Sequence, residues 1–227
     1  MQAYKQEFIR FMLECEVLLF GDFVTKSGRK TPFFVNTGKY RTGEQIARLG
    51  RFYAESIMEH TGGEIDVLFG PAYKGIPLAV AAASSLYNGF NRNVAFCFNR
   101  KEAKDHGEGG VFIGHKLVAG NRVLIIEDVV TAGTSVGETV PLLKAEAPVK
   151  LAGLVVSVDR QERGKEGTRT ALTDIRESYG MKTFAIVTMA EVVEYLHGRE
   201  IGGKVLLTDE IRKRIGEYYA QYGGTEV

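Results

Sequence analysis

Two acidic residues stand where an apolar stretch of the sequence ends, and small residues rich in hydroxyls follow them. Residues 123–135 read VLIIEDVVTAGTS, so Glu127 and Asp128 come directly after four apolar residues. The segment 131–135 offers backbone N–H groups and three hydroxyls where we expect a helix to begin, which is a favourable place for an anion such as phosphate. Its small side chains leave the amides accessible to that phosphate.

The two carboxylates require a different ligand, because they repel a phosphate. They can accept hydrogen bonds from vicinal hydroxyls, or they can hold a cation. The whole stretch is therefore typical of a sugar-phosphate site, with the phosphate on residues 131–135 and the ribose hydroxyls on Glu127 and Asp128. The alternative is an ordinary polar turn in which Thr134 or Ser135 caps the next helix.

The elements around this stretch predict a doubly wound α/β fold. Continuous apolar runs are typical of strands covered on both faces of a parallel sheet. They occur at five places: 65–69, 94–98, 123–126, 151–158 and 183–187. Helical patterns at 44–59 and 76–87 alternate with the strands. A strand that ends at Ile126 puts residues 127–134 at the carboxyl edge of the sheet, where ligands bind in such folds.

We expect one domain, residues 1–227, because no repeat, low-complexity segment or linker divides the chain. An amphipathic helix and a polar turn leading to aromatic residues form a hood over roughly 1–42. The core covers roughly 43–205, and a closing helix covers roughly 208–222 with Thr208 or Asp209 as its N-cap. The segment from Asn99 to about Asn121 shows no helical pattern, and its glycines and charges predict a long mobile loop.

Composition limits the function classes. Of 227 residues, 44% are hydrophobic and 25% are charged, and the formal net charge is +1, which is typical of a globular protein and argues against a nucleic-acid-binding protein. No apolar run approaches the roughly 20 residues of a membrane helix, and the N-terminus does not resemble a signal peptide. The two cysteines, Cys15 and Cys97, favour a reducing compartment, so we expect a cytoplasmic protein without membrane partners.

Other phosphate-binding motifs are excluded. The segment 70–75, GPAYKG, has the spacing of two P-loop glycines, but Ile76 and Pro77 follow where a P-loop requires Lys and Ser or Thr. The glycines at 107–110 follow no predicted strand and open no helix, so they are not a dinucleotide fingerprint.

The motif VLIIEDVVTAGTS resembles the phosphoribosyl pyrophosphate (PRPP) motif of the type I phosphoribosyltransferases. Further stretches are similar to the orotate phosphoribosyltransferases, in the same order over nearly the whole chain: TKSGRKTPFF (25–34), FGPAYKGIP (69–77), FNRKEAKDHGEGG (98–110) and SVDRQERG (157–164). The resemblance implies the type I fold, with a central, mostly parallel five-stranded sheet flanked by helices, an N-terminal hood and a long flexible catalytic loop.

The resemblance also implies the ligand of each motif. The PRPP 5′-phosphate would lie on 131–135, the ribose hydroxyls on Glu127 and Asp128, and the diphosphate on Tyr73 and Lys74. Loop cations would stabilise the departing diphosphate and exclude water. The implied PRPP-binding residues are Tyr73, Lys74, Arg100, Lys101, Lys104, His106, Glu127, Asp128, Val129, Val130, Thr131, Ala132, Gly133, Thr134 and Ser135. Of these, Lys104, Arg100, Lys101, His106 and Asp128 are the implied catalytic residues.

For the acceptor, the resemblance implies a site in the hood and at the end of a strand. Its implied orotate-binding residues are Lys26, Phe33, Phe34, Val35, Thr131 and Arg160, although Val35 stands where the family often has a second aromatic residue. Alternatives stay open for several of these residues. Phe33 can simply be core packing, and Arg160 can be a structural ion pair. Lys74 and the loop cations can be solvated surface charges, and His106 can be a salt-linked loop residue.

The reaction implied is transfer of the phosphoribosyl group from PRPP to orotate, giving orotidine 5′-monophosphate and pyrophosphate. Mg²⁺ is expected as the cofactor, held mainly by PRPP oxygens rather than by protein ligands. The loop, with Lys101, is expected to reach the neighbouring subunit of a homodimer whose active sites are shared. Two other functions remain open: a phosphoribosyltransferase for a purine or uracil, and a regulatory protein that keeps the PRPP fold but binds DNA or RNA.

Overall fold

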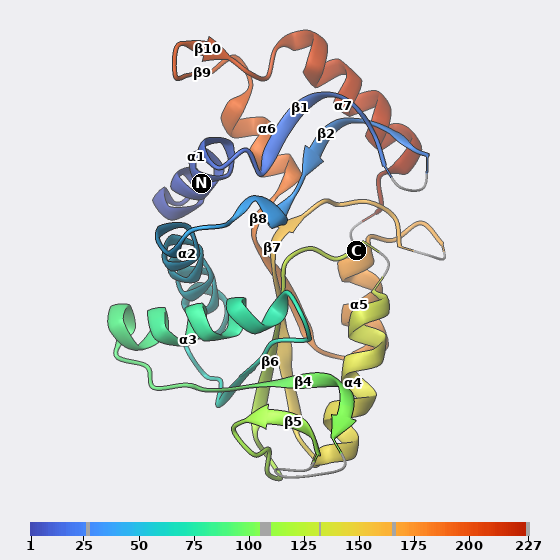
Figure 1. The fold of residues 1–227 in the computed structure, drawn as a ribbon. Helices are drawn as coiled ribbons and strands as arrows, with labels where there is room; N and C mark the ends of the chain where they lie inside the picture. The colour runs from blue at the N-terminus through green and yellow to red at the C-terminus, as the bar shows by residue number, and fades with distance from the viewer. Residues whose placement is uncertain (26–27, 105–109, 132, 165–166, 226–227) are drawn as a thin grey trace.

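A six-stranded sheet forms the centre of the molecule (Figure 1). The computed structural model describes residues 1–25, 28–104, 110–131, 133–164 and 167–225, with the backbone alone for 102–104. The strand order is β5-β4-β3-β6-β7-β8, and all neighbouring pairs are parallel except β4 with β5. The strands are β3 (Val67–Phe69), β4 (Ala95–Lys104), β5 (Gly110–Gly114), β6 (Arg122–Glu127), β7 (Lys150–Asp159) and β8 (Lys182–Thr188).

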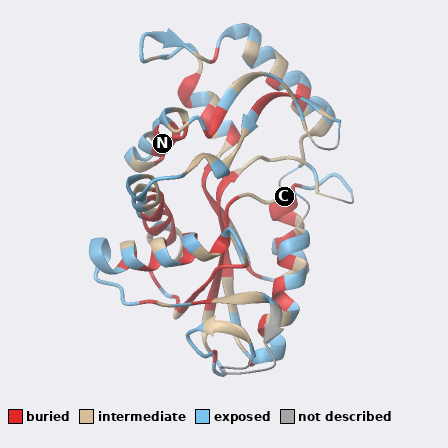
Figure 2. Cartoon of the chain, viewed as in Figure 1, coloured by how far each residue is buried: buried red, intermediate tan, exposed pale blue. Residues whose placement is uncertain are grey.

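Two hydrophobic clusters cover the two faces of the sheet, because successive side chains of a strand point to opposite faces. In β6, Leu124 and Ile126 belong to the cluster that includes α1, α2 and α3, whereas Val123 and Ile125 belong to the cluster of α4 and α5. The central strands are buried, and the helices expose their outer faces (Figure 2). These helices are α1 (Ala3–Glu14), α2 (Gly43–Thr61), α3 (Gly75–Phe90), α4 (Thr134–Glu146) and α5 (Ala171–Tyr179).

The hood pairs with the C-terminal helix above the sheet (Figure 1). It contains an antiparallel hairpin, β1 (Leu18–Val24) with β2 (Lys30–Val35), and a short 3₁₀ helix, η1 (Thr37–Lys39). The hairpin contacts α7 (Asp209–Tyr222), which is capped by Thr208 as expected. The short α6 (Met189–Leu196) and the two-stranded ribbon of β9 (Glu200–Ile201) and β10 (Lys204–Val205) precede α7. None of the described helices is long and apolar enough to cross a membrane.

The segment from Asn99 to about Asn121 was predicted to be a loop, but part of it forms strands in the structure. Residues 99–104 continue β4, and β5 pairs with it antiparallel, with Phe98 opposite Ile113 and Asn99 opposite Phe112. The sheet therefore has a sixth strand beyond the five expected. The apolar run at 111–113 forms this edge strand. The sequence did not predict it, because the run is short and is flanked by glycines and charged residues. The expected mobile loop falls partly on residues 105–109, outside the described residues.

Candidate functional site

The acid pair lies at the carboxyl edge of the sheet, as the sequence predicted. Strand β6 ends at Glu127, and α4 begins at Thr134 after Gly133, whose φ of 68° lies in the left-handed region that glycine adopts at little cost. Strand β3 pairs directly with β6, so the segment that follows β3 emerges beside the acid pair. Residues 70–75 and 127–135 therefore meet at one edge.

Both carboxyl-bearing residues are nearly buried, with 7% of Glu127 and 8% of Asp128 exposed. Their main chain is held from inside the core: the hydroxyl of Tyr53 donates to the carbonyl of Glu127 at 2.7 Å, and that of Ser157 donates to the carbonyl of Asp128 at 2.6 Å. The hydroxyl of Ser135 donates to the Glu127 carboxyl. Burial nevertheless raises the pKa of Glu127, because desolvation outweighs that hydrogen bond.

Asp128 is bound by two donors on a single oxygen. Lys74 Nζ lies 2.7 Å from Oδ2, and Thr37 Oγ1 donates to the same atom at 2.6 Å. Lys74 also donates to Thr37 at 3.3 Å. No described residue donates to the other oxygen, Oδ1.

The turn before α3 brings two glycines into contact. A Cβ on Gly70 would lie 2.1 Å from the carbonyl oxygen of Gly75, so any larger residue at position 70 would collide with backbone. The peptide bond between Ala72 and Tyr73 is cis, and the Ala72 amide donates to Asn99 Oδ1 of β4 at 2.9 Å.

The structure places only some of the predicted loop cations. The ammonium of Lys101 lies 5.3 Å from the ring centre of Tyr73 in the same chain, and Arg100 donates to the carbonyl of Gly110 at 3.4 Å. Lys104 lies in β4, where only its backbone is described. Lys26, His106 and Ala132 lie outside the described residues.

The predicted acceptor residues divide into core and surface. Phe33 is fully buried, with its ring 5.6 Å from that of Tyr218 and 6.1 Å from that of Tyr219, so its ring is core packing. Phe34 is 36% exposed and stacks on Phe23 at 5.6 Å. The ring of Phe34 can therefore face a planar ligand, whereas Phe33 can offer only its backbone.

Arg160 directly follows β7 and lies in a polar cluster with Glu162 and Tyr219. Its Nη2 lies 2.5 Å from Oε1 of Glu162, and only 17% of its side chain is exposed. Its Nε is buried and has no hydrogen-bond partner among the described residues. A buried donor of this kind is costly unless a ligand satisfies it.

Four functional candidates were missed from the sequence: Thr37, Tyr53, Glu162 and Arg29. Thr37 meets Asp128 across 91 positions, and Arg29 meets Glu162 across 133. Arg29 and Glu162 lie within quoted motifs and Thr37 lies close to one, but only the folded chain brings these residues to their distant partners.

Comparisons with known proteins identify the family of this chain. The model of the phosphoribosyl transferase domain matches residues 36–188. The orotate phosphoribosyltransferases of Clostridium beijerinckii and Clostridium acetobutylicum are 62% and 57% identical over 223 residues, which is 98% of this chain and 99% of each relative. The crystal structure of the Francisella tularensis orotate phosphoribosyltransferase matches with a TM-score of 0.84 and 36% identity over 96% of this chain and 100% of that one. The chain thus belongs to the orotate phosphoribosyltransferase family.

Proposed function

We propose that this chain transfers the 5-phosphoribosyl group from PRPP to orotate, giving orotidine 5′-monophosphate and pyrophosphate. A bond forms between the ribose anomeric carbon and orotate, the bond to diphosphate breaks, and the anomeric carbon inverts. Besides family membership, one observation carries the proposal: a nearly buried acid pair ends β6 beside Lys74 and before the N-terminus of α4.

The donor would bind across this edge. Backbone amides at 131–135 would receive the 5′-phosphate at the N-terminus of α4. The ribose hydroxyls would donate to Asp128 Oδ1 and to the carboxyl of Glu127. Because Thr37 and Lys74 already hold Oδ2 of Asp128, this carboxylate is oriented before the donor arrives.

The diphosphate would lie over the turn at 70–75, with Tyr73 and Lys74 beside it. Charge builds on the diphosphate as it leaves, and cations held nearby stabilise that charge. Arg100 and Lys101 lie on β4 next to this turn, and we propose that Lys104 and His106 act with them. We further propose that this segment also serves the partner subunit of a homodimer.

The acceptor would bind between the hood and the end of β7. Orotate is a flat anion, and the guanidinium of Arg160, with 17% of its side chain exposed, would meet its charge. Phe34 would cover one face of the ring, while Lys26, the backbone of Phe33 and Val35, and Thr131 would meet its edges.

Mg²⁺ would be held mainly by the diphosphate and ribose oxygens. The described residues contain no group of three or more His, Cys, Asp or Glu side chains that could hold a metal ion. When bound with PRPP, the ion would neutralise diphosphate charge.

Turnover tests the proposal against the other phosphoribosyltransferases. With PRPP and Mg²⁺ present, orotate consumption is followed by absorbance beside parallel reactions with uracil, hypoxanthine and adenine. The proposal predicts turnover with orotate far above that with the other bases. Preference for another base would reassign the acceptor, and PRPP binding without any turnover would favour a regulatory role.

A further inference from the structure

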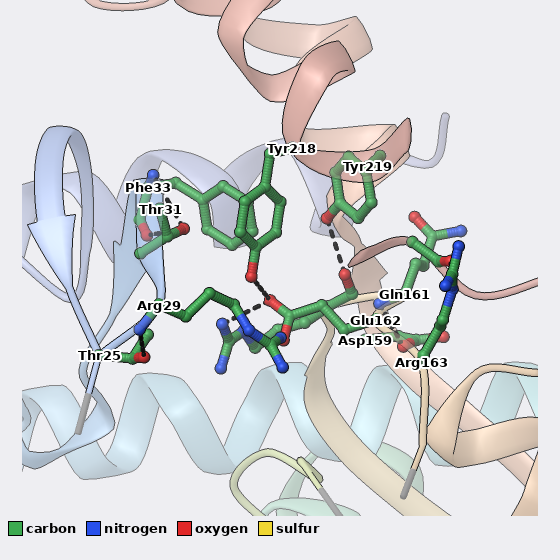
Figure 3. Close-up of polar contacts among 12 residues, drawn as sticks. Thr25, Arg29, Thr31, Phe33, Asp159, Gln161, Glu162, Arg163, Tyr218 and Tyr219 are labelled. Carbon is green, nitrogen blue, oxygen red and sulfur yellow. Dashed lines mark hydrogen bonds and ion pairs between the residues drawn. The ribbon is translucent and has the colours of Figure 1, made fainter. Parts of the chain in front are cut away.

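One carboxylate, that of Glu162, collects donors from three separate segments (Figure 3). Arg160 Nη2 lies 2.5 Å from Oε1, Tyr218 of α7 donates to Oε1 at 2.8 Å, and Arg29 of the hood donates to Oε2 at 3.3 Å. Only 11% of the Glu162 side chain is exposed. Neither the reaction nor the sequence motifs assign this residue a role.

We propose that Glu162 is the positioning residue of the orotate site, holding Arg160 and the hood turn in place for the acceptor. The inference rests on the proposed transfer to orotate and adds a residue that does not touch the substrate itself.

Arg160 is held in place by three contacts. Glu162 fixes one nitrogen of the guanidinium, the hydroxyl of Tyr219 donates to the Arg160 carbonyl at 2.7 Å, and the ring of Phe33 lies 5.8 Å from the guanidinium carbon. These contacts restrain both ends of a long side chain, of which 17% is exposed. The restrained guanidinium is therefore preorganised to donate to an anion.

Glu162 also holds the hood, through Arg29. Arg29 closes a turn in which the amide of Thr25 donates to the carbonyl of Arg29 at 2.9 Å and the amide of Arg29 donates to Thr25 Oγ1 at 3.1 Å. The Arg29 guanidinium also lies 4.5 Å from the ring centre of Tyr222 in α7. The contact between Arg29 and Glu162 therefore ties Arg29 of the hood to the segment that follows β7.

The charges of Glu162, Arg160 and Arg29 also affect acceptor binding. A single carboxylate is shared between two guanidinium groups, so it does not fully neutralise either of them. The geometry favours an anionic acceptor over a neutral one, because a neutral base would gain much less from Arg160. Glu162 itself lowers this positive charge, so its contribution to orotate binding comes from the position that it gives Arg160.

The test replaces Glu162 with glutamine, which keeps the shape and removes the charge. We expect the KM for orotate to rise about tenfold or more, as for a lost charge-assisted contact, while the KM for PRPP changes little. Tyr218→Phe, which removes one donor and keeps both ion pairs, should raise the KM for orotate by a smaller factor. The matched control is Glu191→Gln, which removes the ion pair with Lys5 at 2.7 Å but can keep its helix cap, and it should leave both KM values unchanged.

Each outcome decides between roles. If Glu162→Gln leaves the KM for orotate unchanged, or raises both KM values equally together with a lower thermal midpoint, the positioning role is refuted. If Glu162→Gln does not fold, an unchanged KM for orotate in Tyr218→Phe refutes it instead. Wild-type protein that is inactive on orotate would overturn the proposed function and this inference together, whereas an active wild type with unchanged variants would overturn the inference alone.

Discussion

Replacing Thr37 with valine removes a hydroxyl that donates to Asp128 Oδ2 at 2.6 Å and changes the side-chain volume little. A hydrogen bond to a charged group is worth about 1.5–3 kcal/mol. The lower end applies here, because Lys74 stays on the same oxygen, although with 65% of its side chain exposed it restrains Asp128 less firmly. A loss of about 1.5 kcal/mol corresponds to about a tenfold change in affinity.

The assay is the initial rate of orotate consumption at varied PRPP concentration. We expect Thr37→Val to raise the KM for PRPP about tenfold and to leave the KM for orotate unchanged, because Thr37 orients only the carboxylate proposed for the ribose. Thr37→Ser keeps the donor and should remain close to wild type. Thr61→Val makes the same substitution in the last turn of α2, where Thr61 donates to the carbonyl of Ile57, and controls for general effects on stability.

A wild-type KM for PRPP in Thr37→Val would refute the reasoning that Thr37 orients Asp128. An equal rise of both KM values in Thr37→Val and Thr61→Val would show that the effect comes from stability rather than from the site.

Three further predictions follow from the same site and core. Lys104→Ala should lower turnover by orders of magnitude with a smaller effect on orotate affinity, and wild-type turnover would contradict the catalytic role of Lys104. Mixing Lys104→Ala with Lys26→Ala should restore part of the activity if subunits share a site, and no recovery would contradict the shared site. Burial raises the pKa of Glu127 above its usual 4.5, so the charge of Glu127 destabilises the fold as the pH rises from below 4.5 through the raised pKa. Glu127→Gln should therefore raise the thermal midpoint at neutral pH but not in acid, while weakening PRPP binding. An equal shift of the thermal midpoint at both pH values would contradict this prediction. Burial raises the pKa of Cys97 to about 12, so a thiol reagent should label the partly exposed Cys15 much faster than Cys97 in the native protein. After denaturation it should label both cysteines. Equal labelling rates in the native protein would show that Cys97 is accessible.

The fold was largely predictable because its strands are continuous apolar runs and its site lies where one of them ends. Val123–Ile126 and the acid pair after it were placed by this local signal alone, and the structure has them at the edge of the sheet. The edge strand β5 was not predicted, because five residues that include two glycines carry little local signal, and its pairing with β4 is a tertiary contact.

The supporting residues of the site were not predictable for the same reason. Glu162 contacts Tyr218, which is 56 positions away in the sequence, and Arg29, which is 133 positions away. No local sequence pattern predicts contacts over such separations. Phe33 was part of a predicted motif, but the sequence could not tell whether its ring contacts a ligand or packs in the core. Its complete burial in the structure shows that the ring is core packing.

The central claim is that PRPP and orotate meet at this edge, with the donor on β6 and α4 and the acceptor on Arg160 and the hood. A crystal structure with Mg²⁺, orotate and a non-reactive PRPP analogue tests it most directly. The account predicts the 5′-phosphate on 131–135, ribose hydroxyls on Glu127 and Asp128, the diphosphate over Tyr73 and Lys74, and the orotate anion on Arg160. A sugar phosphate bound elsewhere, or orotate without contact to Arg160, would contradict it.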